Sequence, residues 1–189
     1  MPRLFTGLEL PQSVRMRLSL MRMPLPGARW VEPEDFHITL RFAGDIDNRI
    51  ADEFASFLDD IEVVPFDISI SGVGFFGGRT PRVIWAGVEG GEALANLQRA
   101  HERAARRAGL EPDSQTFRPH VTLARLKGTR PDAVARFLSS RGGLRSEAFR
   151  VERFALFSAK PGSGGGPYVV EHAYQLGGEA ASFRGKVGT

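Results

Sequence analysis

The chain has 189 residues, 42% of them hydrophobic, which suits one domain or two small fused halves and is too apolar for a disordered protein. The formal net charge of +3 is too small to indicate a protein that wraps long nucleic acid. Cysteine is absent, which excludes disulfides, thiolate nucleophiles and cysteine-based metal sites, and no apolar run is long enough to cross a membrane, so we expect a cytoplasmic protein without a membrane partner.

Hydrophobic periodicity predicts alternating strands and helices, with the most regular helical pattern at 91–108 and the clearest strand alternation at 66–73. In chain order, the expected elements are strand 3–9, helix 13–21, strand 36–43, helix 50–58, strand 66–73, strand 82–88, helix 91–108, strand 119–126, helix 131–138, strand 148–158 and strand 168–176. Short connections between several strands favour hairpins. The sequence therefore predicts an α+β fold with mostly antiparallel sheets.

Two glycine-rich stretches separate expected strands. GFFGGRTP at 74–81 is typical of a hairpin connection. KPGSGGG at 160–166 is either a hairpin tip or a phosphate cradle; the absence of a GK[ST] pattern and of a following helix favours the hairpin tip.

Residues 37–54 (HITLRFAGDIDNRIADEF) resemble residues 120–137 (HVTLARLKGTRPDAVARF). Both begin with His-x-Thr-Leu, continue with an arginine and a glycine, and lead into an expected helix. This similarity indicates an internal duplication, which predicts two similar lobes that each offer one His-x-Thr strand to a shared cleft.

The spacing within each motif places histidine and threonine on one face of a strand. Side chains at i and i+2 point the same way, about 6.6–7 Å apart along the backbone. His37 and Thr39 therefore share one face, as do His120 and Thr122, while the intervening aliphatic residues face the core. Two such strands brought together would surround one space with two imidazoles and two hydroxyls.

That arrangement suits cleavage of a phosphodiester. Histidine has a pKa of about 6.5, so one imidazole can act as a base while the other acts as an acid. Threonine hydroxyls can donate to the phosphoryl oxygens as negative charge grows. Arg125 has the parity of the opposite face of an ideal strand, so a twist, a bulge or its long side chain would be needed for it to bind phosphate.

Other readings of these residues are open. The motif histidines could be ordinary half-buried strand residues, and His101, on the surface of an expected helix, and His172 are interpreted as structural or solvated. Two histidines without a nearby third ligand do not indicate a metal site, so no metal and no cofactor are expected. Tyr168 follows the second glycine-rich stretch and is a candidate for contact with a nucleobase.

The segments RLFTGLELP (3–11), RWVEPEDFHITLRFAG (29–44) and FRPHVTLAR (117–125) resemble the two-histidine (2H) phosphoesterase superfamily, most closely its RNA 2′,3′-cyclic phosphodiesterase branch, also called 2′-5′ RNA ligase. The resemblance covers most of the chain. It implies a bilobal domain spanning 1–189, with a pseudo-twofold axis and two mostly antiparallel sheets lining a central cleft, helices outside, and catalysis without a metal.

The resemblance also implies roles for the motif residues. His37 would be the proton donor to the leaving 3′ oxygen, His120 the proton acceptor that activates water, and Thr39 and Thr122 would hold the phosphoryl oxygens. Near-symmetric lobes leave it open whether the two histidines exchange these roles. The expected partners are RNA ends or nucleotides that carry a cyclic phosphate, and no obligate protein partner is evident.

Two alternatives remain at this level. A binding module could hold RNA ends or another phosphorylated ligand without turnover, although arginine or lysine would bind phosphate better than imidazole at neutral pH. The same chemistry could instead open a cyclic phosphate on an ADP-ribose derivative, cleave a 2′-5′ linkage, or run in reverse as a ligase.

Overall fold

The structure is a computed structural model that describes residues 3–159 and 166–177. The helices are α1 (Gln12–Ser19), α2 (Asn48–Asp59), α3 (Gly91–Arg107) and α4 (Pro131–Arg141), with a 3-10 turn η1 (Pro33–Asp35). The strands are β1 (Arg3–Glu9), β2 (Ala28–Trp30), β3 (His37–Asp45), β4 (Phe66–Phe76), β5 (Val83–Glu89), β6 (His120–Leu126), β7 (Phe149–Val151), β8 (Arg153–Ala159) and β9 (Tyr168–Gln175).

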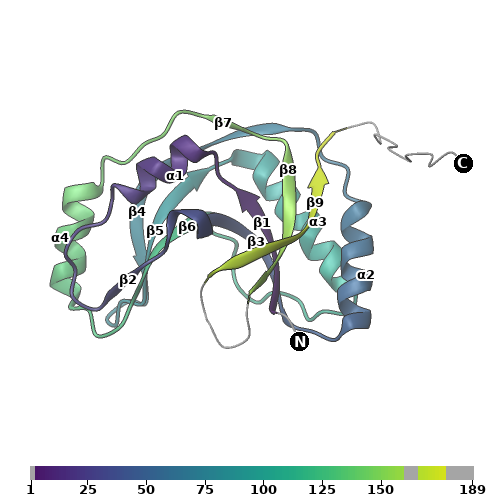
Figure 1. Cartoon of the computed structure of the whole chain (residues 1–189), viewed down its shortest axis with the longest axis horizontal. Helices are drawn as coiled ribbons and strands as arrows, with labels where there is room; N and C mark the ends of the chain where they lie inside the picture. Colours follow the sequence, from purple (N-terminus) through teal and green to yellow (C-terminus); the bar gives the residue numbers. More distant parts are fainter. Residues whose placement is uncertain (1–2, 160–165, 178–189) are drawn as a thin grey trace, which may run out of the picture.

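The strands form one continuous, strongly curved path in the order β7-β4-β5-β6-β3-β1-β8-β9, and β2 pairs with β6. Every pairing is antiparallel, which confirms the expected α+β class. The two expected sheets correspond to the two halves of this strand order, β7-β4-β5-β6 and β3-β1-β8-β9. Figure 1 shows the arch that they form, with α4 beyond one half and α2 and α3 beyond the other.

The halves meet between β3 and β6, where Ile38 lies opposite Val121 and is the one registered pair. The order of elements is the same in both halves at this point, because a helix follows each of the two strands: α2 follows β3, and α4 follows β6. A glycine at positive φ also lies near the end of each strand, Gly44 (76°) within β3 and Gly128 (68°) two residues after β6, where a side chain would strain the backbone. These parallels agree with the internal duplication that the sequence indicates.

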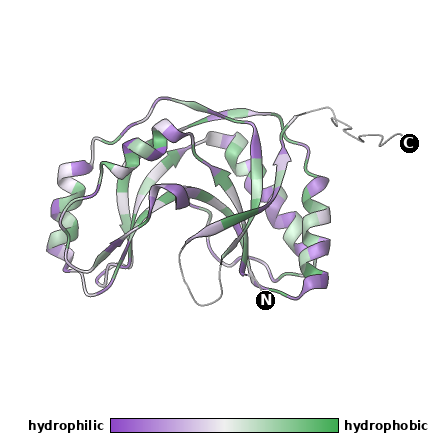
Figure 2. Ribbon diagram, in the orientation of Figure 1, coloured by the Kyte–Doolittle hydropathy of each residue, from purple (hydrophilic) through white to green (hydrophobic). Residues whose placement is uncertain are grey.

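A hydrophobic core fills the convex side of the arch, between the sheet and the helices. Its fully buried members come from both halves, and Figure 2 shows apolar residues on the inner faces of the helices and strands. Because the motif strands alternate, Ile38 and Val121 are completely buried and their neighbours face the concave side.

One histidine lies in this core, and its predicted surface position is wrong. His101 is 0% exposed and its ring packs edge-on against Phe154, with the ring centroids 4.4 Å apart. It falls on the buried stripe of α3, four residues after Leu97 and three before Ala104. The helical spacing alone would have placed it there.

Three further differences concern the strands. The expected strand 66–73 extends to Phe76, because the two aromatic residues at its end pair with the start of β5. The expected strand 148–158 is two strands, β7 and β8, which pair with β4 and β1 in opposite halves. The sequence also gave no sign of β2 or η1. The β8–β9 hairpin is confirmed by its pairing, whereas residues 160–165 of its glycine-rich tip lie outside the described residues.

Candidate active site

The junction of the two halves brings the four motif residues together. Because Ile38 lies opposite Val121 in an antiparallel pair, the next positions outward are His37 opposite Thr122 on one side and Thr39 opposite His120 on the other. All four are half-buried, and their aliphatic neighbours point into the core. The concave face therefore holds both imidazoles and both hydroxyls around the local twofold centre.

The two imidazoles are oriented in the same way. The Nδ1 of His37 is 2.8 Å from the carbonyl oxygen of Asp35, and the Nδ1 of His120 is 2.6 Å from that of Arg118. A carbonyl oxygen only accepts, so Nδ1 carries the proton and donates in both rings. In the neutral imidazoles this leaves Nε2 free of a proton and able to accept one.

Thr39 links the two sides of the site. Its hydroxyl lies 3.0 Å from Nε2 of His37 and donates to that nitrogen when the imidazole is neutral. The same threonine and His120 both line a cavity of about 100 Å³, whose other walls are residues 40–42 of β3, the segment 113–118 and Gln98 of α3. The hydroxyl of Thr39 is thus in contact with one imidazole and faces a space that it shares with the other.

Aromatic side chains form similar walls around both histidines. The ring of Tyr168 meets that of His37 edge-on (5.0 Å, 83°), and the ring of Phe76 meets that of His120 with nearly the same geometry (5.0 Å, 84°). Phe5 adds a second contact to His37, with the ring centroids 4.7 Å apart.

These walls change the acidity of the imidazoles. Burial lowers the pKa of His37 to about 4; the positive charges of His120 and Arg125 lower it further, while the bond to the Asp35 carbonyl raises it. Burial also lowers the pKa of His120, against the opposing effect of its bond to the Arg118 carbonyl. Both imidazoles are therefore mainly neutral in the free protein at pH 7.

A bulge brings Arg125 to the concave face, contrary to the parity of an ideal strand. Thr122 lies opposite Trp85 and Ala124 lies opposite Ile84, so Leu123 is the extra residue in β6. After this residue the alternation is reversed, and exposed Arg125 shares the face of Thr122. Its influence on the pKa of His37 places its charge within reach of the site.

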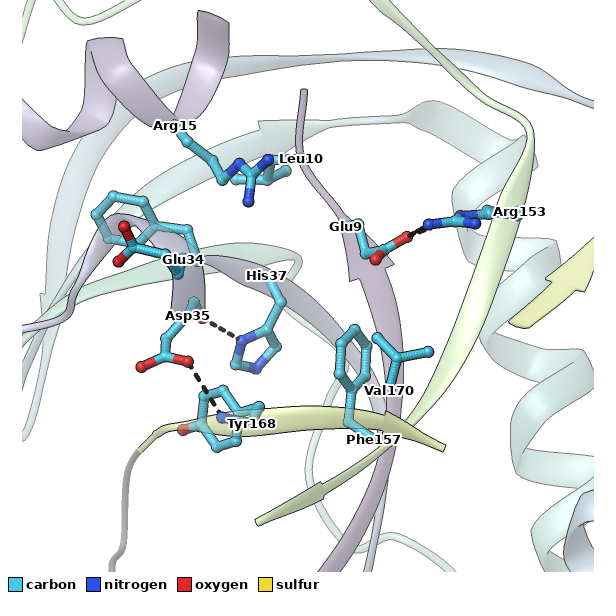
Figure 3. Close-up of a pocket in the computed structure, with 11 residues that line it drawn as sticks. Glu9, Leu10, Arg15, Glu34, Asp35, His37, Arg153, Phe157, Tyr168 and Val170 are labelled. Carbon is cyan, nitrogen blue, oxygen red and sulfur yellow. Dashed lines mark hydrogen bonds and ion pairs between the residues drawn. The ribbon is translucent and has the colours of Figure 1, made fainter. Parts of the chain in front are cut away.

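A second cavity, of about 220 Å³, lies on the other side of His37 (Figure 3). Its lining includes Tyr168 and Phe157, together with Arg15 and the paired side chains of Glu9 and Arg153. The predicted contact of Tyr168 with a nucleobase is untested, but the residue does border a space next to the first motif histidine.

Asp35 forms hydrogen bonds with both His37 and Tyr168. Its carbonyl oxygen accepts from His37, and its carboxylate accepts from the backbone N–H of Tyr168 at 3.1 Å. In Figure 3 both interactions appear as dashed lines on either side of the Asp35 side chain. The sequence offered no signal for this role, because η1 and the pairing of β9 bring together residues 133 positions apart.

Within residues 3–159 and 166–177, no group of three or more His, Cys, Asp or Glu side chains is arranged to hold a metal ion. His172, on β9, is exposed. In the same part of the chain, no helix combines the length and apolarity that spanning a membrane requires.

Comparison with known proteins connects this geometry to a family. The profile of the 2′-5′ RNA ligase superfamily matches residues 11–162. An RNA 2′,3′-cyclic phosphodiesterase of Aquifex aeolicus is 33% identical over 175 residues, which cover 90% of this chain and 91% of that protein. One from Aeropyrum pernix is 42% identical over 118 residues, covering 61% of this chain and 66% of that protein.

Solved structures agree with the fold. The crystal structure of E. coli LigT complexed with 3′-AMP superimposes with a TM-score of 0.76, covering 93% of this chain and 99% of that one at 22% sequence identity. At 22% sequence identity, this structural similarity shows a shared fold only. Membership of the family rests on the sequence matches. The chain belongs to the 2′-5′ RNA ligase superfamily.

Proposed function

We propose that this chain hydrolyses 2′,3′-cyclic phosphates at RNA ends or on nucleotides to 2′-phosphates, with two histidines as acid and base. The observation that carries the proposal is the register of β3 and β6, which sets two His-x-Thr pairs around one centre on the concave face. The relatives named RNA 2′,3′-cyclic phosphodiesterase support the choice of substrate.

In the proposed reaction, Nε2 of His120 takes a proton from water as its oxygen bonds to phosphorus. The P–O3′ bond breaks, and the 3′ oxygen receives a proton from Nε2 of His37. The hydroxyls of Thr39 and Thr122 donate to the non-bridging oxygens, where negative charge develops. Arg125 adds a fixed positive charge on the same face.

The acid needs a proton that His37 does not hold at neutral pH in the free protein, because burial lowers its pKa to about 4. Binding of the anionic phosphate stabilises the imidazolium and raises this pKa. The carbonyl of Asp35 also favours the charged ring. Substrate binding and protonation of the acid are therefore coupled in this proposal.

The test is a panel of cyclic-phosphate substrates with identification of the products, run with and without EDTA. We expect a 2′-phosphate product, no loss of rate in EDTA, and a rate reduced at least about 10²-fold in His37→Ala and in His120→Ala. His172→Ala, an exposed histidine on β9, is the matched control and should keep the parent rate. Tight binding of every substrate without turnover would instead favour a binding module.

A further inference from the structure

The concave face next to His120 carries two cations, Arg29 and Lys127, that the proposed chemistry does not use, beside Arg125, which it does. We propose that Arg29 and Lys127, together with Arg125, bind the phosphates of the RNA strand that leads to the reacting end. We call these three residues the basic track. The proposal rests on the proposed function, and it specifies the substrate as an RNA strand rather than a free nucleotide.

The strand register places Arg29 and Arg125 on one face, and Lys127 follows one residue past the end of β6. Arg29 of β2 lies directly opposite Arg125 of β6, so both point the same way. The neighbouring pair, Trp30 and Ala124, points into the core, where the ring of Trp30 packs against Phe137 at 5.7 Å. Arg29 therefore faces the concave side with Arg125.

Lys127 extends the track away from the site. Exposed Arg125 and Lys127 flank buried Leu126, so the alternation of β6 continues through them. The backbone N–H of Lys127 donates to the carbonyl of Gly27 at 2.9 Å, which keeps this residue beside β2. Along one strand face the order is thus His120, Thr122, Arg125 and Lys127.

The Arg29–Arg125 pair is unfavourable on its own, because like charges directly opposite each other repel. Among the described residues, no acidic side chain forms an ion pair with any member of the basic track. Glu32, the first acid after Arg29 in the sequence, is paired with Arg22 at 3.3 Å. An anion bound between the two guanidinium groups would turn the repulsion into attraction, and phosphate fits the planar donors of arginine.

β3, the matching strand of the other half, carries no such run. At the same distances from His37 along β3 lie Phe42 and Gly44, which carry no charge. The cavity on the far side of His37 is lined by the acidic residues Glu9, Glu34 and Asp35 but also by Arg15 and Arg153, and Arg153 is paired with Glu9. Along the two motif strands the pseudo-symmetry is therefore broken in charge, which favours the path of a polyanionic strand over the half that contains His120.

The experiment compares the double variant Arg29→Gln/Lys127→Gln with the parent protein on two substrates. One is a single-stranded RNA of about eight nucleotides ending in a 2′,3′-cyclic phosphate, and the other is a 2′,3′-cyclic mononucleotide. We expect kcat/KM for the RNA to fall about tenfold, while that for the mononucleotide stays unchanged. The salt dependence of RNA binding should also become less steep by about 1.4 in a log–log plot, since two phosphate contacts are lost.

Arg106→Gln removes an exposed cation from α3, whose buried face packs on the opposite side of the sheet, and should change neither substrate. Thermal unfolding of the double variant should occur at the same or a higher temperature, because a like-charge pair is removed. A lower unfolding temperature would mean that these cations are structural and would overturn the proposal.

A second measurement separates this proposal from the proposed function. Binding of the same RNA ending in a 2′-phosphate, followed by fluorescence anisotropy, does not depend on turnover. If the parent protein hydrolyses neither substrate but the double variant binds this RNA about tenfold more weakly, the proposed reaction fails and the basic track stands. If the double variant keeps full affinity for the RNA, the proposal is overturned, and an acidic protein would be the partner to seek for this surface.

Discussion

Removing the aromatic wall of one histidine should change the acidity of that histidine alone. The rings of Tyr168 and Phe76 make T-shaped contacts of matching geometry with His37 and His120, so Tyr168→Ala and Phe76→Ala form a matched pair. Burial lowers the pKa of His37 from 6.5 to about 4, which corresponds to about 3.4 kcal/mol against the charged ring. Tyr168 is one of three aromatic neighbours of that ring, beside Phe5 and Phe157.

If each neighbour excludes a similar share of water, Tyr168→Ala raises the pKa of His37 by about 0.8 unit, or about 1.1 kcal/mol. The assay is a side-chain NMR titration of the free protein, in which each imidazole is followed separately. Tyr168→Ala should move the titration of His37 and leave that of His120 in place, and Phe76→Ala should do the reverse. A parent protein in which His37 titrates near 6.5, or a variant that shifts both rings equally, would refute burial as the cause.

Three further predictions follow from the same contacts. The pH dependence of kcat should be shifted to higher pH relative to that of kcat/KM, because a bound phosphate raises the pKa values of both imidazoles, which burial lowers in the free protein. Identical pH dependences of kcat and kcat/KM would contradict this. Arg41→Leu should reduce the free energy of unfolding in urea by about 3 kcal/mol, since it leaves the partner of a nearly buried ion pair, Glu102 (2.5 Å), uncompensated. The exposed Arg49→Leu control should cost under about 0.5 kcal/mol, and equal losses would refute the argument. Burial lowers the pKa of His101 to about 3, so the unfolded chain takes up the proton first and this residue alone reduces stability by about 2 kcal/mol at pH 5. In denaturation curves measured at pH 7 and pH 5, His101→Leu should remove about this much of the loss, while the contributions of His37 and His120 remain.

The sequence was sufficient to place the four motif residues, because strand alternation and an internal repeat are both local patterns. It was not sufficient for Arg125, whose face depends on the extra residue Leu123, and a bulge is visible only in the register between two strands. Arg29 could not be connected to Arg125 either, because β2 has three residues and no alternation long enough to detect. The burial of His101, in contrast, was predictable from the stripe of α3.

The pairing of distant segments also limited what could be inferred about the surroundings of His37. Its walls come from β1, β8 and β9, and its Nδ1 partner comes from η1, which the sequence did not indicate. The lowered pKa of this residue is therefore a property of the fold. A sequence motif can name the acid and the base, but it cannot give their pKa values.

The convergence of the two imidazoles is the central claim, and nitrogen NMR of the histidine side chains tests it most directly. A nucleoside 2′-monophosphate, the product of the proposed reaction, is titrated into the protein while Nε2 and Nδ1 of each ring are observed. We predict that Nε2 of both His37 and His120 shifts with the same binding curve, while both Nδ1 atoms keep their proton and their bonds to the backbone carbonyls. A shift at only one of the two Nε2 atoms, or shifts with different affinities, would contradict a single phosphate site between them.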